Sequence, residues 1–308
     1  MKAFLFPGQG SQKPGMGKAL FDAHDEAKAV FKEADEVLGF PLSTLCFEGP
    51  ESELTLTANA QPAILTTSVA ALRVLESKTG VRPDVVAGHS LGEYSALVAA
   101  SGLRMADAVR LVHLRGKFMQ EAVAPGEGAM AAILGLEGAA VAEACQEAAR
   151  ELGAVVSPAN LNGGGQVVIA GTKATVDRAC ELAKAKGAKR AIPLQVSAPF
   201  HCALMAPAAE RLAAELAKVE VTPLAVPVVT NIEAAANRDA SRVRALLTRQ
   251  VTGTVRWEES VQALVALGVG TAYEVGHGNV LAGLVKRIAP SLAVTGVSDP
   301  ASVAALAV

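Results

Sequence analysis

The hydrophobic positions of the chain alternate between short apolar runs and segments of helical periodicity. Buried strands are predicted at residues 3–6, 84–87, 226–230 and 272–275. Helices are predicted over these ranges: 27–38, 63–75, 96–100, 106–123, 203–218, 241–250, 257–267 and 279–288. Pro62 is expected to start the helix at residue 63, because proline is favoured in the first helical turn. Strands that alternate with helices indicate an α/β fold.

The pattern changes in the middle of the chain. Strands are predicted at 129–134, 154–157, 167–170 and 191–194, with helices at 139–152 and 174–186 between them. The order β-α-β-β-α-β is that of a ferredoxin-like unit. We therefore predict a small ferredoxin-like domain at residues 126–195, inserted into a large domain made of residues 1–125 and 196–308.

The composition is that of a folded globular protein. Of the 308 residues, 51% are hydrophobic and 19% are charged, and the mean hydropathy is +0.34. Such a balance excludes intrinsic disorder. The net charge of −2 gives none of the clustered positive charge with which proteins bind nucleic acid, so nucleic acid is not an expected ligand.

The cysteines and the longest uncharged stretches bear on the compartment. The four cysteines include no CxxC pair and no histidine at metal-ligand spacing, so neither a zinc site nor a disulfide framework is predicted. The apolar stretch at 3–6 is too short for a signal peptide. The uncharged stretches 54–72 and 152–172 contain polar amides, proline or glycine and are not expected to span a membrane. We expect a cytoplasmic monomer without a metal.

The pentapeptide Gly88-His89-Ser90-Leu91-Gly92 matches G-x-S-x-G. In this turn small residues flank a serine whose strained backbone lifts its hydroxyl above a sheet. A buried strand is predicted before it and a helix after it, which is the required context. Ser90 is therefore predicted to be a nucleophile, with the Leu91 amide at the helix N-terminus available to bind an oxyanion.

A serine nucleophile needs a base, and a second oxyanion donor has to come from elsewhere in the chain. The turn Gly8-Gln9-Gly10 lacks the glycine and Gly-Lys spacing of phosphate loops, and could place the Gln9 amide beside the serine. Two histidines, His201 and His277, could each lie beyond a strand end, and their spacing does not choose between them. The other three are better explained as solvated, packed or adjacent to the serine: His24, His113 and His89.

Further segments occur at fixed spacing around these residues. They are Phe6-Pro7-Gly8-Gln9-Gly10-Ser11-Gln12, Gly88 to Tyr94, Arg115-Gly116, Asn160-x-Asn162, Gln166 to Gly171, Ser197 to His201, Gln250 and Val255-Arg256-Trp257. In order and spacing, over nearly the whole chain, they resemble the malonyl-CoA:acyl carrier protein transacylases and the acyltransferase domains of polyketide and fatty acid synthases. The family's prolines are replaced at three turn positions: Gly164, Thr254 and His277.

The resemblance implies an α/β-hydrolase-like large domain and a division of roles at its nucleophile elbow. Ser90 would be acylated and His201 would be its base. The backbone carbonyl of Gln250 would orient the histidine in place of a triad aspartate. The amides of Gln9 and Leu91 would form the oxyanion hole.

The resemblance also implies the substrate. Arg115, by itself a candidate surface residue, would grip the free carboxylate of malonate, because a guanidinium matches a carboxylate through two parallel hydrogen bonds. Phe200 resembles the residue associated with malonyl rather than methylmalonyl selectivity, although a core phenylalanine explains it equally well. His89 and Asn162 are further candidates to line the substrate site, with a turn-capping role as the alternative for Asn162.

The expected activity is the transfer of a malonyl group from coenzyme A to the phosphopantetheine thiol of an acyl carrier protein, through a malonyl-serine intermediate. No resident cofactor is implied, since the partner carries the phosphopantetheine. A serine hydrolase or thioesterase and a non-enzymatic docking module are the alternatives. A basic cluster on the small domain is either a solvated helix end or a contact for an acidic carrier protein: Lys184, Lys186, Lys189 and Arg190.

Overall fold

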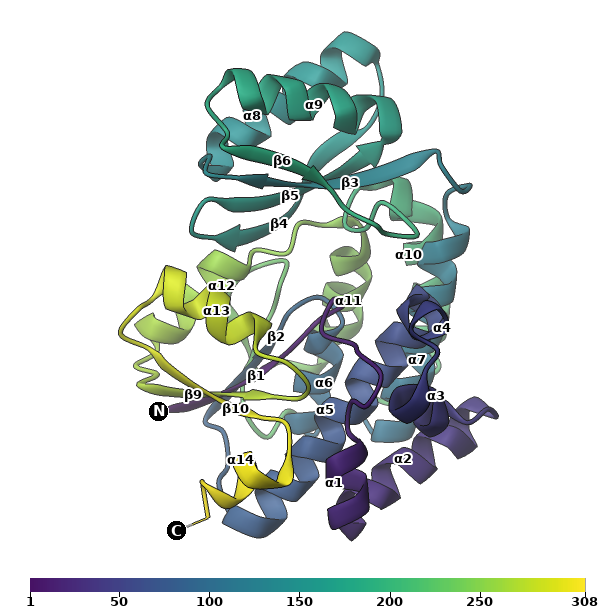
Figure 1. Cartoon of the computed structure of the whole chain (residues 1–308), viewed down its shortest axis with the longest axis vertical. Helices are drawn as coiled ribbons and strands as arrows, with labels where there is room; N and C mark the ends of the chain where they lie inside the picture. The colour runs from purple at the N-terminus through teal and green to yellow at the C-terminus, as the bar shows by residue number, and fades with distance from the viewer. Residues whose placement is uncertain (308) are drawn as a thin grey trace.

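The larger of two sheets runs through the lower part of the molecule (Figure 1). The computed structural model describes residues 1–307 and places six strands in the order β10-β9-β1-β2-β7-β8. All neighbours pair in parallel except β7 and β8. The strands are β1 (Lys2–Phe6), β2 (Val85–Gly88), β7 (Val228–Val229), β8 (Ala236–Asn237), β9 (Thr271–Val275) and β10 (Ala293–Val297).

Helices cover both faces of this sheet, as buried parallel strands require. Successive residues of a strand point to opposite faces, so Phe4 and Phe6 belong to one core and Ala3 and Leu5 to another. The first core is covered by α2 (Asp25–Leu38), α5 (Thr57–Thr79), α6 (Gly92–Ala99), α7 (Met105–Glu121), α10 (Ala206–Leu216), α11 (Val243–Thr252) and α14 (Pro300–Ala304). The second is covered by α12 (Trp257–Ala266) and α13 (Val280–Ile288).

The second sheet lies above the first (Figure 1) and holds four antiparallel strands in the order β4-β5-β3-β6. One face packs against two helices through residues such as Ile133 and Ile169. The other face carries Met130 and Val168, which belong to the main core on the side of the larger sheet. In chain order the elements are β3 (Gly128–Leu134), α8 (Gly138–Leu152), β4 (Val156–Gly163), β5 (Gln166–Thr172), α9 (Lys173–Ala185) and β6 (Arg190–Pro193).

The predicted α/β class and the βαββαβ order of the small sheet are confirmed. The division into residues 126–195 and the rest stays a prediction. Several short elements escaped the sequence pattern because they are brief or half-exposed: α1 (Lys18–Ala23), α3 (Leu42–Glu48), α4 (Glu51–Thr55), β8, β10 and α14. The strand expected at 226–230 is reduced to two residues, and the helix expected from 203 begins with a 3₁₀ turn over Ala203–Met205.

The prediction that Pro62 starts a helix is wrong. Helix α5 begins at Thr57 and contains Pro62 in its interior. A proline there has no N–H for the carbonyl of residue 58, which is normally costly. Nδ1 of His113 on α7 lies 2.8 Å from the Ala58 oxygen and donates the missing hydrogen bond. A side chain from a neighbouring helix thus lets α5 continue through the proline.

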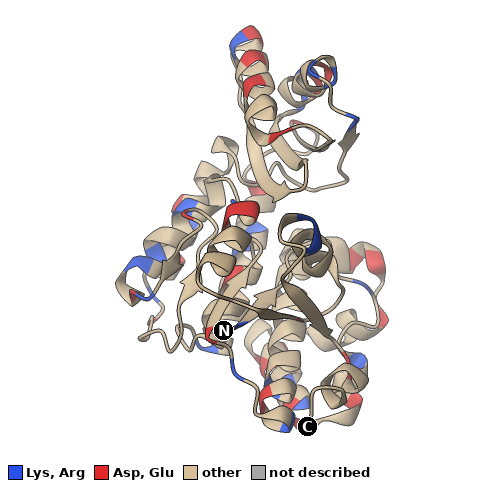
Figure 2. Cartoon of the chain, turned by 90° about the vertical axis from the view of Figure 1, so that its left-hand side faces the viewer, with Lys and Arg blue, Asp and Glu red and all other residues tan. Residues whose placement is uncertain are grey.

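Charged residues lie mostly on the helices and loops, with both signs interspersed (Figure 2). Sixteen ion pairs join these residues within residues 1–307. Most of the pairs join residues three or four positions apart in the sequence, or side chains that are exposed. In the same described range, none of the helices is both long and apolar enough to cross a membrane.

Candidate active site

Ser90 lies at the tip of a sharp turn between β2 and α6. Its φ is +53°, a left-handed conformation that is strained for a residue with a side chain. The turn closes only because its flanks are glycines. A Cβ on Gly88 would lie 2.0 Å from the backbone of Gly92, and one on Gly92 would lie 2.2 Å from the oxygen of Phe6. The sequence pattern therefore forms a true nucleophile elbow at the carboxyl end of the central strands.

His201 is the histidine that faces the serine. Its Nε2 lies 2.7 Å from Ser90 Oγ, and its Nδ1 lies 2.9 Å from the backbone oxygen of Gln250. A carbonyl oxygen can only accept, so Nδ1 carries the proton and Nε2 accepts from the serine. The structure thereby separates the two histidines that spacing left open, since the hydrogen bonds of residues 1–307 include none between His277 and Ser90.

His201 is buried, with only 3% of the residue exposed. Burial, followed by the positive charge of Arg115, lowers the pKa of His201 to about 3. The ring is therefore neutral at physiological pH and free to take a proton from Ser90.

Arg115 enters the site from α7 and is buried, with 2% of its surface exposed. Its Nη2 lies 3.0 Å from both Ser90 Oγ and Gln250 Oε1, and its Nη1 lies 2.7 Å from Gln61 Oε1. The buried Nε has no hydrogen-bond partner in the described chain. Burial lowers the pKa of this guanidinium, yet no ion pair of residues 1–307 includes it. A buried cation that contacts Ser90 without a paired anion is suited to an anionic ligand.

Asn231 and Glu93 belong to the site although sequence reasoning did not single them out. Asn231 Oδ1 accepts from the Ser90 amide at 2.7 Å, and its Nδ2 donates to the Gly88 oxygen at 2.7 Å. The Glu93 carboxylate accepts from the Asn231 amide at 3.0 Å and from Gln250 Nε2 at 2.9 Å. The available signal was positional, because Asn231 follows a predicted strand at the edge where parallel strands end.

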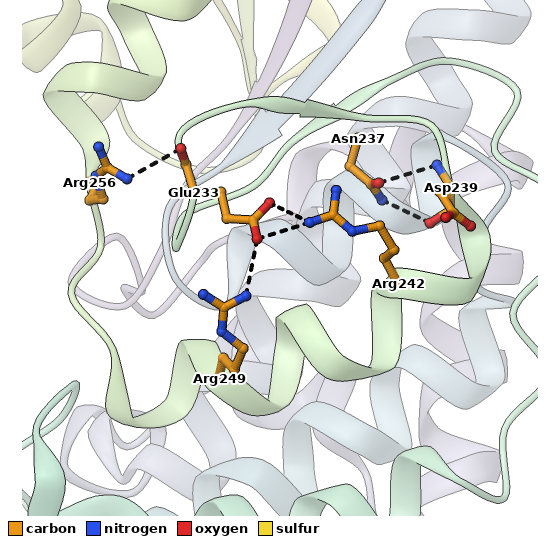
Figure 3. Close-up of polar contacts among 6 residues, drawn as sticks. All are labelled: Glu233, Asn237, Asp239, Arg242, Arg249 and Arg256. Atoms are coloured by element: carbon orange, nitrogen blue, oxygen red, sulfur yellow. Dashed lines mark hydrogen bonds and ion pairs between the residues drawn. The ribbon is translucent and has the colours of Figure 1, made fainter.

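A surface cluster fastens the segment that carries Asn231 (Figure 3). The Glu233 carboxylate accepts from Arg242 at 2.8 and 2.9 Å and from Arg249 at 3.0 Å. Arg256 donates to the Glu233 backbone oxygen at 3.3 Å, and its own amide donates to the Asn231 oxygen at 3.0 Å. Arg242 and Arg249 lie at or on α11, the helix of Gln250, so the cluster ties two parts of the site together.

The two predicted oxyanion donors lie on the turns that follow β1 and β2. Gln9 lines the pocket after β1, and Leu91 directly precedes α6. Gly8, beside Gln9, packs so closely on the elbow that a Cβ there would lie 2.4 Å from the His89 oxygen. Among the hydrogen bonds of residues 1–307, neither the backbone amide of Gln9 nor that of Leu91 has a protein acceptor. Both are available to a substrate oxygen.

A pocket of about 560 Å³ opens above Ser90, between the loops that follow β1 and β2 and strands β3, β4 and β5 of the small sheet. Its roof includes Asn162, whose Oδ1 lies 2.8 Å from Nε2 of His89. Phe200 lines the wall beside His201. Burial lowers the pKa of His89, which keeps this ring neutral and able to donate to the amide oxygen. Seven of the nine predicted site residues line this pocket: Gln9, His89, Ser90, Arg115, Asn162, Phe200 and His201. Of the other two, Gln250 accepts a hydrogen bond from Arg115, and Leu91 directly follows Ser90.

Within residues 1–307, no group of three or more His, Cys, Asp or Glu side chains could hold a metal ion. What the site offers to a substrate is a hydroxyl, an imidazole, a guanidinium and two backbone amides.

Similar proteins share this chain from end to end. The family model described as an acyl transferase domain matches residues 3–306. The malonyl CoA-acyl carrier protein transacylase of Escherichia coli K12 is 52% identical over 303 residues, which cover 98% of this chain and 97% of that protein. The enzyme of the same name from Bacillus subtilis 168 is 52% identical over 301 residues, which cover 98% and 94%.

Solved structures agree with the sequence relatives. An acyl carrier protein S-malonyltransferase from Vibrio cholerae superimposes with a TM-score of 0.96 at 49% identity, covering 99% of both chains. A malonyl-transacylase in complex with a type II polyketide acyl-carrier protein gives a TM-score of 0.96 at 48% identity, covering 99% of this chain and 98% of that one. The likeness supports the hydrolase-like and ferredoxin-like parts of the fold. The chain belongs to the acyl transferase family, in its malonyl-CoA:acyl carrier protein transacylase branch.

Proposed function

We propose that this enzyme moves a malonyl group from coenzyme A to the phosphopantetheine thiol of an acyl carrier protein. The observation that carries the proposal is the position of Ser90 Oγ, 2.7 Å from the His201 base and 3.0 Å from the Arg115 guanidinium. One atom is thus placed to be activated and to receive an acyl group whose far end is anionic.

The first half-reaction loads the serine. His201 Nε2 takes the Ser90 proton while Oγ attacks the thioester carbon. The amides of Gln9 and Leu91 hold the oxyanion. When the tetrahedral intermediate collapses, the carbon–sulfur bond breaks, and the coenzyme A thiolate leaves with the proton from His201. The product is a malonyl-serine ester.

The second half-reaction unloads the serine with the same groups. The carrier's pantetheine thiol gives its proton to His201, and its sulfur attacks the ester carbon. The carbon–oxygen bond to Ser90 breaks, and the oxygen recovers the proton. Because the first product leaves before the second substrate reacts, we expect ping-pong kinetics.

Arg115 gives the reason for a malonyl group. The carboxylate of malonate is two bonds from the acyl carbon, so it falls beside a guanidinium that already contacts Ser90 Oγ. A fork of N–H donors matches its two oxygens. An acetyl group would leave the buried cation without a partner, which disfavours its transfer.

The chemistry draws on protein groups alone, so we propose that no resident cofactor takes part and that the carrier brings its own phosphopantetheine. The four cysteines are free thiols in the structure, and three of them are buried. Free thiols support a reducing compartment such as the cytoplasm.

The deciding experiment is intact-mass spectrometry after brief mixing with malonyl-CoA. We expect one malonyl adduct on the wild type, none on Ser90→Ala, and a much weaker adduct with acetyl-CoA. Adding acyl carrier protein should move the malonyl group to the carrier. Release of free malonate without transfer would identify a hydrolase, and absence of any adduct would overturn the transferase assignment.

A further inference from the structure

The buried carboxylate of Glu93 has no direct cationic partner. Glu93 is the second residue of α6, yet only 2% of it is exposed. Its two hydrogen bonds come from the neutral donors Asn231 N and Gln250 Nε2. The salt bridges of residues 1–307 do not include it. A carboxylate buried in this way is costly, so its place beneath the nucleophile calls for an explanation.

Gln250 connects this carboxylate to the buried cation. Its Oε1 accepts from Arg115 Nη2 at 3.0 Å, and its Nε2 donates to Glu93 at 2.9 Å. An arginine only donates and an ionised glutamate only accepts, so the amide has a single orientation that satisfies both. The positive and negative groups therefore act on each other across one side-chain amide.

Arg115 is the charged residue that acts on Glu93 from the elements packed around it. The elements packed against α6 are α5, α7, β1, β2 and β7. Apart from Arg115 on α7, their buried residues are uncharged. Tyr94 is the neighbouring titratable group, and burial raises its pKa far above the physiological range. Burial also raises the pKa of Glu93 to about 7, against its two hydrogen bonds and the attraction of Arg115.

We propose that Glu93 is the internal counter-charge of Arg115 and sets how strongly the pocket prefers an acyl group that carries a carboxylate. The inference rests on the proposed malonyl transfer and adds a specificity-determining residue that acts through Gln250. An ionised Glu93 partly neutralises the site, which lets Arg115 tolerate a neutral acyl group. With Glu93 uncharged, the cation depends on the substrate carboxylate.

The first test is Glu93→Gln, which keeps an acceptor oxygen for Asn231 and Gln250 while removing the charge. We expect the ratio of kcat/KM for malonyl-CoA to that for acetyl-CoA to rise on the order of tenfold, with a lower KM for malonyl-CoA. The matched control is Glu274→Gln. Glu274 is also buried, but it accepts from the backbone amides of Leu281 and Ala282 and has no link to Arg115. Its ratio should match the wild type.

The second test varies the pH, and its wild-type half needs no variant. Lowering the pH from about 8 to about 6 protonates Glu93, so the selectivity ratio should rise in the wild type and stay flat in Glu93→Gln. His201 stays neutral and Arg115 stays charged over this range. This arm decides the question if circular dichroism shows that the variant does not fold.

An unchanged ratio in the folded Glu93→Gln variant would overturn the inference. So would a wild-type ratio that does not rise as the pH falls. Failure of the wild type to form any malonyl adduct would instead refute the proposed function, so the two failures are distinguishable.

Discussion

The two sheets of this enzyme treat charge in opposite ways. At the edge of the parallel sheet, Glu93, Arg115 and His201 are almost completely buried, and burial shifts the pKa of all three. On the helices of the antiparallel sheet, Arg178 pairs with Glu151 and Glu181, and 37–68% of each of these side chains is exposed. Exposed pairs contribute little, whereas buried ones respond strongly to any change in a partner. The buried titratable groups are concentrated where segments distant in sequence meet at one sheet edge.

Among substitutions that compare the two regions, Gly92→Ala should have the largest effect on stability and activity. A Cβ at this position would lie 2.2 Å from the backbone oxygen of Phe6, which cannot move aside as a side chain could. We expect a loss of about 2–4 kcal/mol of unfolding free energy and no detectable malonyl adduct. In the antiparallel sheet region, Gly138→Ala meets only Leu161 Cδ2 at 3.5 Å, an ordinary contact. Thermal unfolding and intact mass together test both variants, and an active Gly92→Ala would contradict the elbow geometry.

The next effect concerns the two kinds of arginine. Arg115→Lys keeps a positive charge but loses the planar fork, so kcat/KM for malonyl-CoA should fall on the order of a hundredfold. The matched change Arg178→Lys should leave both activity and melting temperature unchanged within error. Stopped-flow acylation assays would decide, and equal effects of the two substitutions would remove the distinction between buried and exposed cations.

A smaller effect separates two asparagines. Asn231→Ala leaves the Ser90 amide and the Gly88 oxygen unpaired in the interior, which should cost about 1–3 kcal/mol and lower kcat for acylation about tenfold. Asn162→Ala frees only the His89 ring at the pocket wall, where water can replace the amide. Its kcat should change less than threefold. Similar losses of kcat for both variants would mean that the hydrogen bond of Asn162 matters to acylation as much as those of Asn231.

The smallest expected effect is that of pH on the acylation rate. Because burial lowers the pKa of His201 to about 3, the acylation rate should not fall between about pH 8 and pH 5, unlike a rate that depends on a histidine titrating near 6.5. A rate profile with malonyl-CoA at saturating concentration tests this. A midpoint near 6.5 would mean that the ring is more solvated than the structure indicates.

Much of the site could be predicted from the sequence because its residues lie in short, recognisable segments. The elbow is defined by five consecutive residues with glycines at fixed positions, and Arg115, His201 and Gln250 lie in segments whose spacing resembles a known family. Asn231 and Glu93 were missed because their roles depend on which strand ends and helices become neighbours. Each is an unremarkable polar residue until the turn after β7 and the first turn of α6 meet.

The fold shows the same limit. Long periodic helices were predicted well, since their patterns depend only on neighbouring residues. Strand β10 was missed, although it pairs with β9 along its length, because its residues are half-exposed and mix threonine and glycine with valine. The helix start at Pro62 was misplaced because the residue that satisfies the orphaned carbonyl is His113, on another helix.

The hydrogen bond from His113 to the Ala58 oxygen couples positions 62 and 113 energetically, although they lie on different helices. A residue with an amide proton at position 62 would compete with His113 for the Ala58 oxygen, and loss of the histidine would leave the proline without its partner. Replacement of either residue therefore carries a penalty that replacement of both relieves. Among related sequences, positions 62 and 113 should covary even though neither touches the reacting groups.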